Sequence, residues 1–126
     1  MAETILVVED EETTSSLIRY KLTNSGYTVK CVSDGVQALD AVRASPPDLI
    51  LLDLMLPMFS GREILITLRK EKEFAGIPII ILSAKTLEKD VLEGLALGAD
   101  DFIKKPFSPS ELVARVRMQL SRRKQT

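Results

Sequence analysis

The feature that most constrains the fold of this chain is a regular alternation of short apolar runs with amphipathic segments. Near-continuous apolar runs, rich in leucine or β-branched residues, lie at 5–8, 29–32, 49–52 and 79–82, and a weaker candidate lies at 101–104. The runs are too short for helices and lack the polar alternation of a half-exposed strand, so they predict strands covered on both faces. Strands that alternate with helices predict an α/β fold with a parallel sheet, right-handed crossovers and helices on both faces.

The segments between the runs carry start and stop signals for helices. Gly26 is well placed as a left-handed residue that ends the first helix. Asp34 is a candidate N-cap with Gln37 three residues later, and 108–111 combines a Ser cap, a Pro at the first helical position and a Glu three residues after the cap. The residues expected to form the apolar helix faces are Leu17, Ile18, Leu22, Val36, Leu39, Val42, Ile64, Leu65, Leu68, Leu87, Val91, Leu92, Leu95, Leu112, Val113, Val116 and Leu120.

The composition excludes several classes of function. At 126 residues and a formal net charge of −1, the chain predicts a single globular domain without the basic surface that nucleic acid or a membrane would require. One Cys cannot form an internal disulfide, and without His neither a zinc site nor a Ser-His-Asp triad is expected. No apolar stretch approaches membrane-spanning length and no signal sequence is recognisable, so a cytoplasmic protein is expected. We expect a folded domain over 1–121 and a basic polar tail, or the start of a linker, at 122–126.

Polar side chains gather where the predicted strands end, which is the edge at which an open parallel sheet binds its ligand. Glu9 and Asp10 follow the first strand, Asp53 ends the third, Ser83 ends the fourth and Lys105 follows the fifth. Two carboxylates about 4 Å apart repel by roughly 4 kcal/mol at an effective dielectric constant of about 20, and a hard cation such as Mg²⁺ offsets this repulsion. An acidic solvated loop is the alternative, but an ammonium group beside the carboxylates favours a site for a phosphoryl group.

The sequence resembles a bacterial two-component response-regulator receiver domain over essentially its whole length. The matching fragments are ILVVEDE at 5–11, PDLILLDLMLP at 47–57 together with Gly61, IIILSA at 79–84 and GADDFIKKPF at 98–107. Their order and separations make the resemblance specific. It implies a flavodoxin-like (βα)5 three-layer sandwich with a five-stranded parallel sheet in the order 2-1-3-4-5. The resemblance is greatest to the receivers of winged-helix transcription factors.

The resemblance also implies a role for each residue of the acidic edge. Asp53 would accept a phosphoryl group as a covalent nucleophile. Glu9, Asp10, Asp53 and the backbone carbonyl of Met55 would bind Mg²⁺, and Lys105 would contact a phosphoryl oxygen. The alternative interpretation of the three acidic residues is that they merely cap helices.

Two further residues would transmit the phosphorylation state. By resemblance, Ser83 would reach toward the attached phosphoryl group and Phe102 would follow it inward, changing the face formed by the fourth helix, fifth strand and fifth helix. Phe102 taken alone would more often be a residue of the packed core, so its switch role rests on the family resemblance. The bond between Lys105 and Pro106 is cis in the family, and the neighbouring Lys104 is expected to be a solvated charge.

Candidate interface residues lie on the same face. Asp101, Glu111 and Arg115 would contribute to a homodimer of the kind that winged-helix regulators form. Val91 stands where that subfamily often carries Arg or Lys, which leaves Glu111 without its usual partner and weighs against this dimer. The apolar segment at 58–60 is expected to pack against or shield the loop, with the anchoring of a partner as the alternative.

Other functions fit the sequence less well. A haloacid-dehalogenase-type phosphatase carries a second Asp two residues after its nucleophile, where this chain has Met55, and a cap domain is lacking. A flavin- or nucleotide-binding module needs a phosphate loop after the first strand, where the acidic residues at 9–11 would repel the anion. A pseudo-receiver that binds partners without being phosphorylated is the remaining alternative.

We therefore predict a phosphorylation-dependent signalling switch. It would accept a phosphoryl group from a histidine kinase or phosphotransfer protein, lose it by slow hydrolysis, and control a fused or separate effector without itself contacting nucleic acid. Such a domain catalyses only its own phosphorylation and dephosphorylation, so it is not an enzyme in the usual sense.

Overall fold

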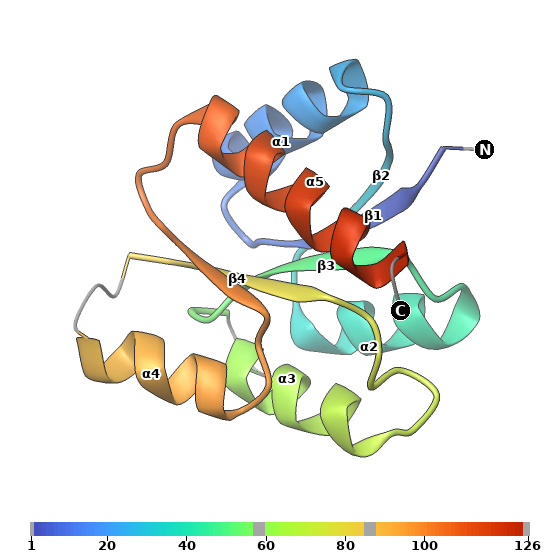
Figure 1. Cartoon of the computed structure of the whole chain (residues 1–126), viewed down its shortest axis with the longest axis vertical. Coiled ribbons are helices and arrows are strands. Elements are labelled where there is room, and N and C mark those ends of the chain that lie inside the picture. Colours follow the sequence, from blue (N-terminus) through green and yellow to red (C-terminus); the bar gives the residue numbers. More distant parts are fainter. Residues whose placement is uncertain (1, 57–59, 85–87, 125–126) are drawn as a thin grey trace.

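The computed structural model describes residues 2–56, 60–84 and 88–124, and within these ranges strands and helices alternate along the chain (Figure 1). Each apolar run of the sequence lies within one strand, which confirms the predicted alternation. The strands are β1 (Thr4–Val8), β2 (Thr28–Val32), β3 (Leu49–Asp53), β4 (Ile79–Ser83) and β5 (Asp101–Lys104). The helices are α1 (Glu12–Asn24), α2 (Gly35–Ala44), α3 (Gly61–Lys70), α4 (Glu88–Ala96) and α5 (Pro109–Lys124).

The strands pair in parallel in the order β2-β1-β3-β4-β5. Helices α1 and α5 cover one face of the sheet, and α2, α3 and α4 cover the other (Figure 1). This arrangement is the flavodoxin-like three-layer sandwich that the resemblance implies. The strand order reverses between β1 and β3, so the carboxyl ends of these neighbours form the crevice where a ligand site is expected.

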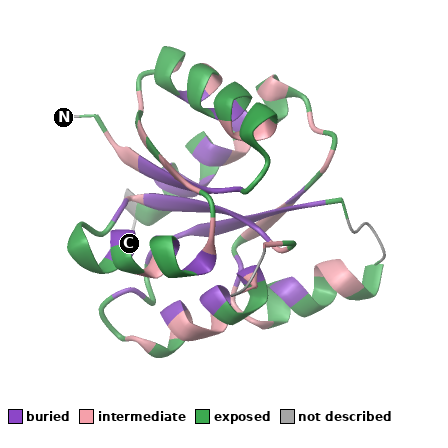
Figure 2. Ribbon diagram, turned by 180° about the vertical axis from the view of Figure 1, so that it is seen from behind, coloured by how far each residue is buried: buried purple, intermediate pink, exposed green. Residues whose placement is uncertain are grey.

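Two apolar cores lie on opposite sides of the sheet, because successive residues of a strand point to opposite faces. On β1, Leu6 and Val8 belong to the core beneath α2 and α3, whereas Ile5 and Val7 belong to the core beneath α1 and α5. Figure 2 shows how burial concentrates in the sheet. The prediction of a strand covered on both faces is wrong for β2, because the helices cover this outer strand incompletely. The other outer strand, β5, is also only partly buried.

The helix boundaries follow the predicted signals. Gly26, just after α1, has a φ of 99°, which a residue with a side chain rarely adopts. The Asp34 carboxylate accepts a hydrogen bond from the Gln37 amide at 2.8 Å and caps α2. The Ser108 hydroxyl accepts one from the Glu111 amide at 3.0 Å at the start of α5. Both caps satisfy amide groups that the first helical turn leaves without a partner.

Four apolar residues that were expected on buried helix faces lie at the surface: Leu17, Val36, Leu92 and Leu95, with 45%, 54%, 57% and 41% of their area exposed. In α4 it is Gly94 that faces the sheet, where an added Cβ would lie 2.7 Å from the Ile81 side chain. The helix thus lies close to β4 at this glycine, whereas Leu92 and Leu95 lie outside the core.

Helix α5 continues to Lys124, past the domain end that was expected at residue 121. Its last turn is tied to the sheet, because the Arg123 guanidinium donates to the Asp48 carbonyl at 2.8 Å and the Asp48 carboxylate accepts from the Thr4 amide at 2.7 Å. Residues 122–124 therefore belong to helix α5. Within the described ranges, no helix combines the length and apolar character needed to cross a membrane.

Candidate functional site

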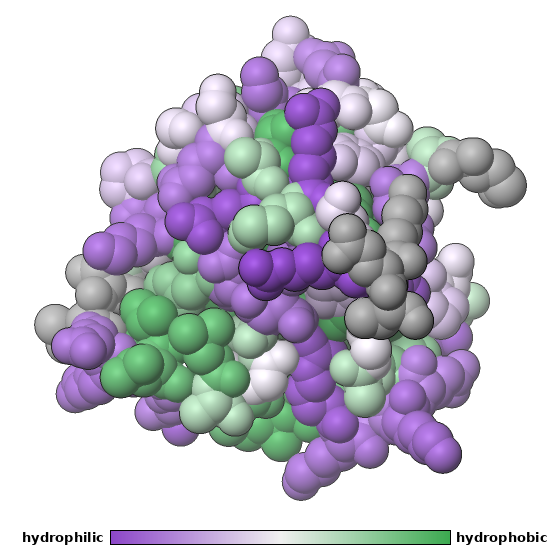
Figure 3. All heavy atoms as spheres, viewed as in Figure 1, coloured by the Kyte–Doolittle hydropathy of each residue, from purple (hydrophilic) through white to green (hydrophobic). Residues whose placement is uncertain are grey.

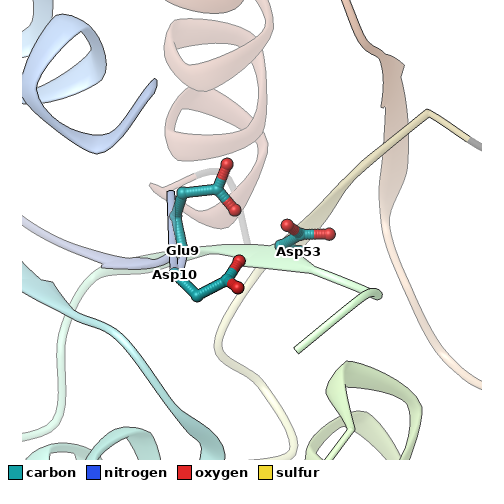
Figure 4. A group of neighbouring side chains, drawn as sticks. All are labelled: Glu9, Asp10 and Asp53. Atoms are coloured by element: carbon teal, nitrogen blue, oxygen red, sulfur yellow. The ribbon is translucent and has the colours of Figure 1, made fainter. Parts of the chain in front are cut away.

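Three carboxylates converge at the carboxyl edge of the sheet. Glu9 and Asp10 directly follow β1, and Asp53 is the last residue of the neighbouring strand β3. Figure 4 shows the Glu9 and Asp10 side chains extending toward the end of β3 that carries Asp53, and one carboxylate oxygen from each residue lies within 4.8 Å of the others. Glu9 and Asp53 are buried, whereas Asp10 is exposed to solvent. The predicted grouping of these three residues is confirmed.

Lys105 reaches this cluster from the loop after β5. Its Nζ atom lies 2.5 Å from Glu9 Oε1 and 3.0 Å from Asp53 Oδ2. The peptide bond between Lys105 and Pro106 is cis, and the Lys105 amide donates to the Ser83 carbonyl at 2.9 Å. Lys104 is exposed, as expected. The structure therefore distinguishes the two lysines: only Lys105 enters the acidic site.

The close approach of these groups shifts their pKa values. Burial raises the pKa of Glu9 to about 8, and the Asp53 carboxylate beside it acts in the same direction. Burial alone would raise the pKa of Asp53, but the Glu9 carboxyl, the Met55 amide and the Lys105 ammonium hold it below its usual value. Burial alone would lower the pKa of Lys105, which the two carboxylates instead raise. The two carboxyl groups are thus shifted in opposite directions, and the site favours the charged form at Asp53 and the neutral form at Glu9.

Both oxygens of the Asp53 carboxylate have a partner. The Met55 amide donates to Oδ1 at 2.8 Å, and Lys105 contacts Oδ2. These two contacts fix the plane of an ionised carboxylate at the open edge of the sheet. Such a carboxylate is suited to covalent nucleophilic chemistry, because it is charged and already oriented.

The donor set fits a divalent cation. Glu9 Oε2 is buried and has no hydrogen-bond partner among the described residues, so an acceptor atom is available inside the cluster. Helix α1 begins after Glu11 without a side-chain cap, so Glu9 and Asp10 are not used as caps. Carboxylate oxygens at this spacing are the ligands that a hard ion such as Mg²⁺ prefers. The acidic cluster is of the kind typical of receiver metal sites.

The remaining predicted site residues lie beside the cluster. Ser83 is fully buried at the end of β4, one residue after Leu82, which is the register partner of Asp53. Phe102 is half-buried against the core beneath α4. Asp101 and Arg115 form an ion pair at 3.0 Å.

The predicted interface residues form a network within one chain. Arg115 contacts Glu111 at 3.2 Å in addition to Asp101, so Glu111 has a partner despite the apolar Val91. The predictions for residues 58, 59 and 87 lie outside the described residues. A groove of about 620 Å³ borders the site at Asp10 and Met55 and runs between α3 and α4.

One residue at the site, Gly61, was named from the sequence only as part of a family motif, and no role was predicted for it. Gly61, the first residue of α3, lies directly against the backbone of Asp53 and Leu54. Ser60 and Glu63 form a capping box that fixes this end of α3, and the S-x-x-E spacing at 60–63 is the signal that could have indicated it.

The strand order, the carboxylate cluster and the lysine together define a receiver of the two-component type, and the comparisons agree. Residues 5–117 match the response regulator receiver domain family. This chain belongs to that family, whose members are signalling modules rather than conventional enzymes.

Particular relatives are similar over nearly the whole chain. The DNA-binding response regulator MtrA of Mycobacterium tuberculosis (strain ATCC 25618 / H37Rv) is 48% identical over 122 residues, which cover 97% of this chain and 52% of the relative. MtrA of Mycobacterium leprae (strain TN) is also 48% identical, with 97% and 53% covered. The chain thus spans about half the length of these curated relatives.

Solved structures show the same fold. The receiver domain of the Francisella response regulator 1452 superimposes with a TM-score of 0.90 at 34% identity, covering 95% of this chain and 98% of that one. The signal receiver domain of a signal transduction histidine kinase from Syntrophus aciditrophicus gives a TM-score of 0.91 at 34% identity, with 99% and 95% covered.

Proposed function

We propose that this chain is a phosphorylation-dependent switch whose phosphoryl acceptor is Asp53. The observation that carries the proposal is the setting of the Asp53 carboxylate: it is oriented by the Met55 amide and contacts the Lys105 ammonium, beside two further carboxylates. The same two contacts help to hold the pKa of Asp53 below its usual value. The donor would be a phosphohistidine of a sensor histidine kinase or of a phosphotransfer protein.

In the transfer step an Asp53 oxygen attacks phosphorus, the P–N bond to the donor imidazole breaks, and the imidazole leaves with a proton from solvent. Lys105 already contacts Asp53, so its ammonium is placed to neutralise charge on the incoming phosphoryl oxygens. Attack of water on phosphorus later releases inorganic phosphate and restores the carboxylate.

Glu9, Asp10, Asp53 and the Met55 carbonyl would hold Mg²⁺. The bound ion would supply further neutralisation of the phosphoryl oxygens during transfer. Before the ion binds, Glu9 has to give up the proton that its raised pKa retains. Binding of the ion is therefore coupled to loss of the Glu9 proton. The ion would also share the carboxylates with the Lys105 ammonium.

The output face would be the one formed by α4, β5 and α5. Ser83 and Phe102 would pass the phosphorylation state from the site to this face. Figure 3 shows apolar side chains gathered over α4, where Leu92 and Leu95 are exposed. A second copy of the chain is a candidate partner for this face, with Asp101, Glu111 and Arg115 beside it.

The effector would be fused to the receiver or would bind it as a separate protein. The similarity to DNA-binding regulators, and the resemblance to receivers of winged-helix transcription factors, support a DNA-binding effector. In that arrangement the receiver unit would include helix α5 to Lys124 and would lie in the cytoplasm.

Intact-protein mass spectrometry after incubation with acetyl phosphate tests the proposal, with and without Mg²⁺ and with Asp53→Asn in parallel. We expect a Mg²⁺-dependent gain of one phosphoryl group that the variant does not show. A wild-type protein that neither gains mass nor binds Mg²⁺ would instead be a pseudo-receiver, which binds partners without being phosphorylated.

A further inference from the structure

We propose that Gly61 is a positioning residue for the phosphorylation site, acting from the first turn of α3 on the backbone that carries Asp53. This inference rests on the proposed function, because the groups it positions are the Asp53 carboxylate and the Met55 carbonyl. Gly61 itself touches neither the phosphoryl group nor the metal ion.

The backbone of the site leaves no room for a side chain at Gly61. A Cβ atom there would overlap the Asp53 carbonyl oxygen and would lie 2.8 Å from Leu54 Cα and 3.0 Å from the Asp53 carbonyl carbon. All three atoms belong to the main chain, so no rotation of a flexible side chain can relieve the overlap. Either α3 or the end of β3 has to move.

Helix α3 is the less movable partner. The Ser60 hydroxyl accepts a hydrogen bond from the Glu63 amide at 3.2 Å, and the Glu63 carboxylate accepts one from the Ser60 amide at 3.4 Å. The same helix places Ile64, Leu65 and Leu68 in the core with almost no exposed area. Moving α3 outward would uncover this apolar surface, which is unfavourable.

The end of β3 is held more weakly. The Leu54 amide donates to the Leu82 carbonyl at 3.3 Å, which is long for a hydrogen bond in a sheet. The next amide, that of Met55, is the donor that orients Asp53 Oδ1. A side chain at Gly61 would therefore displace the peptides at 53–55, and with them the carboxylate and the Met55 carbonyl.

Two other glycines provide matched controls for a glycine-to-alanine change. An added Cβ at Gly94 would lie 2.7 Å from the Ile81 side chain, so it perturbs the core beneath α4 without touching the backbone of the site. An added Cβ at Gly76 meets no atom within 4 Å. None of Gly61, Gly76 and Gly94 has a positive φ. The three glycine-to-alanine substitutions therefore differ mainly in which atoms the new methyl group meets.

The experiment measures the Mg²⁺ affinity of Gly61→Ala, Gly94→Ala, Gly76→Ala and the wild-type chain by calorimetric titration. Backbone amide NMR signals of 53–55 are recorded without Mg²⁺, so one readout does not depend on the ion. Chemical denaturation of each variant reports its stability separately from its Mg²⁺ affinity.

For Gly61→Ala we expect the Mg²⁺ affinity to fall by about tenfold, which is usual when a group that orients a metal ligand is disturbed. The amide signals at 53–55 should shift as well. Gly94→Ala should lose stability and keep the wild-type affinity, and Gly76→Ala should match the wild type in both. Equal affinity and unshifted signals in Gly61→Ala would overturn the positioning role while leaving the proposed function intact.

A second variant keeps the inference testable if Gly61→Ala does not fold. Ser60→Ala retains the glycine but removes the cap that holds α3 against the site. We expect a smaller loss of Mg²⁺ affinity with shifts at the same amides, and an unchanged Ser60→Ala site would overturn the inference. A wild-type chain that binds no Mg²⁺ would refute the proposed function, and the positioning role with it.

Discussion

The ammonium group of Lys105 lies closer to Glu9 than to Asp53, at 2.5 Å against 3.0 Å. The lysine thus occupies the interior of the acidic cluster and partly neutralises the carboxylates that would bind a metal ion. An ion that enters this site competes with Lys105 as well as with the proton on Glu9. The first two predictions follow from these two competitions.

Replacing Lys105 with Ala should change metal binding and phosphorylation in opposite directions. Mg²⁺ affinity should rise by a few-fold, because the ion no longer competes with an ammonium group for the same carboxylates. The rate of phosphorylation by acetyl phosphate should fall by about 100-fold, because one group that stabilises the transferring phosphoryl oxygens is lost. Calorimetric titration and time-resolved intact mass measure the two effects.

Lys104→Ala is the matched control for this prediction. Lys104 is adjacent in sequence and carries the same charge, but it is exposed. The Lys104→Ala variant should keep a Mg²⁺ affinity and a phosphorylation rate near the wild-type values. A Lys105→Ala protein that loses Mg²⁺ affinity would contradict the competition between the lysine and the ion.

Without Mg²⁺, the free energy of unfolding should decrease as the pH rises from about 5 to 8. Folding raises the pKa of Glu9 from 4.5 to about 8, so in this window the folded chain keeps a proton that the unfolded chain has released. Stability falls with pH where the folded state binds more protons, here by about 1 kcal/mol per pH unit. The lowered pKa of Asp53 and the raised pKa of Lys105 act below and above this window.

Denaturation at several pH values in the presence of a chelator measures this slope. Glu9→Gln keeps the shape of the side chain but cannot ionise, so its stability should vary much less over the same range. The same proton should make Mg²⁺ affinity increase with pH up to about 8 in the wild-type chain. A wild-type stability that rises from pH 5 to 8 would show that Glu9 is ionised in the folded protein.

The grouping of the three carboxylates could be predicted from the sequence once the strands were recognised, for one physical reason. A parallel sheet brings the carboxyl ends of its strands to one edge, so Glu9, Asp10 and Asp53 had to meet once β1 and β3 were recognised as neighbours. That neighbour relation came from the family resemblance, because apolar runs do not encode the order of strands. The contact between Lys105 and Glu9 could not be predicted, since it depends on the burial of both groups.

Helix faces were harder to predict than strands. The apolar pattern of α4 suggested a buried stripe that included Leu92 and Leu95, but these two are exposed and it is Gly94 that is buried against the sheet. A glycine adds no hydrophobic signal to a periodicity argument, although it decides how closely two elements pack. The tight contact of Gly61 with the backbone at Asp53 escaped sequence reasoning for the same reason.

Arg69 should be the most important arginine for stability among those of the described residues. Its guanidinium donates to the carbonyls of Gly98, Ala75 and Ile77 at 2.8, 3.1 and 2.9 Å and pairs with Asp100 at 2.9 Å. Arg69→Ala should lower the free energy of unfolding by about 2 kcal/mol, because several carbonyls lose a charged donor. Chemical denaturation measures this loss.

Arg62→Ala is the control for the arginine prediction. Arg62 also lies on α3 and pairs with Glu93 of α4, but both side chains are about half-exposed. An exposed pair of this kind contributes roughly 0.5 kcal/mol or less. Arg69 lies at the edge of the sheet opposite the site, so Arg69→Ala should also keep the wild-type Mg²⁺ affinity. Equal destabilisation by the two variants would contradict the role of Arg69 in joining the loops before β4 and β5.

The exposed leucines of α4 should contribute little to the stability of the single chain. Leu92 has 57% of its area exposed, whereas Ile81, on the strand beneath this helix, has none. Leu92→Ala should therefore change the free energy of unfolding by less than about 0.5 kcal/mol, while Ile81→Ala should lower it by about 3 kcal/mol because it leaves a cavity. Denaturation at low protein concentration measures both values without a contribution from self-association. A loss of more than about 2 kcal/mol for Leu92→Ala would mean that α4 buries its leucine stripe, as its sequence suggested.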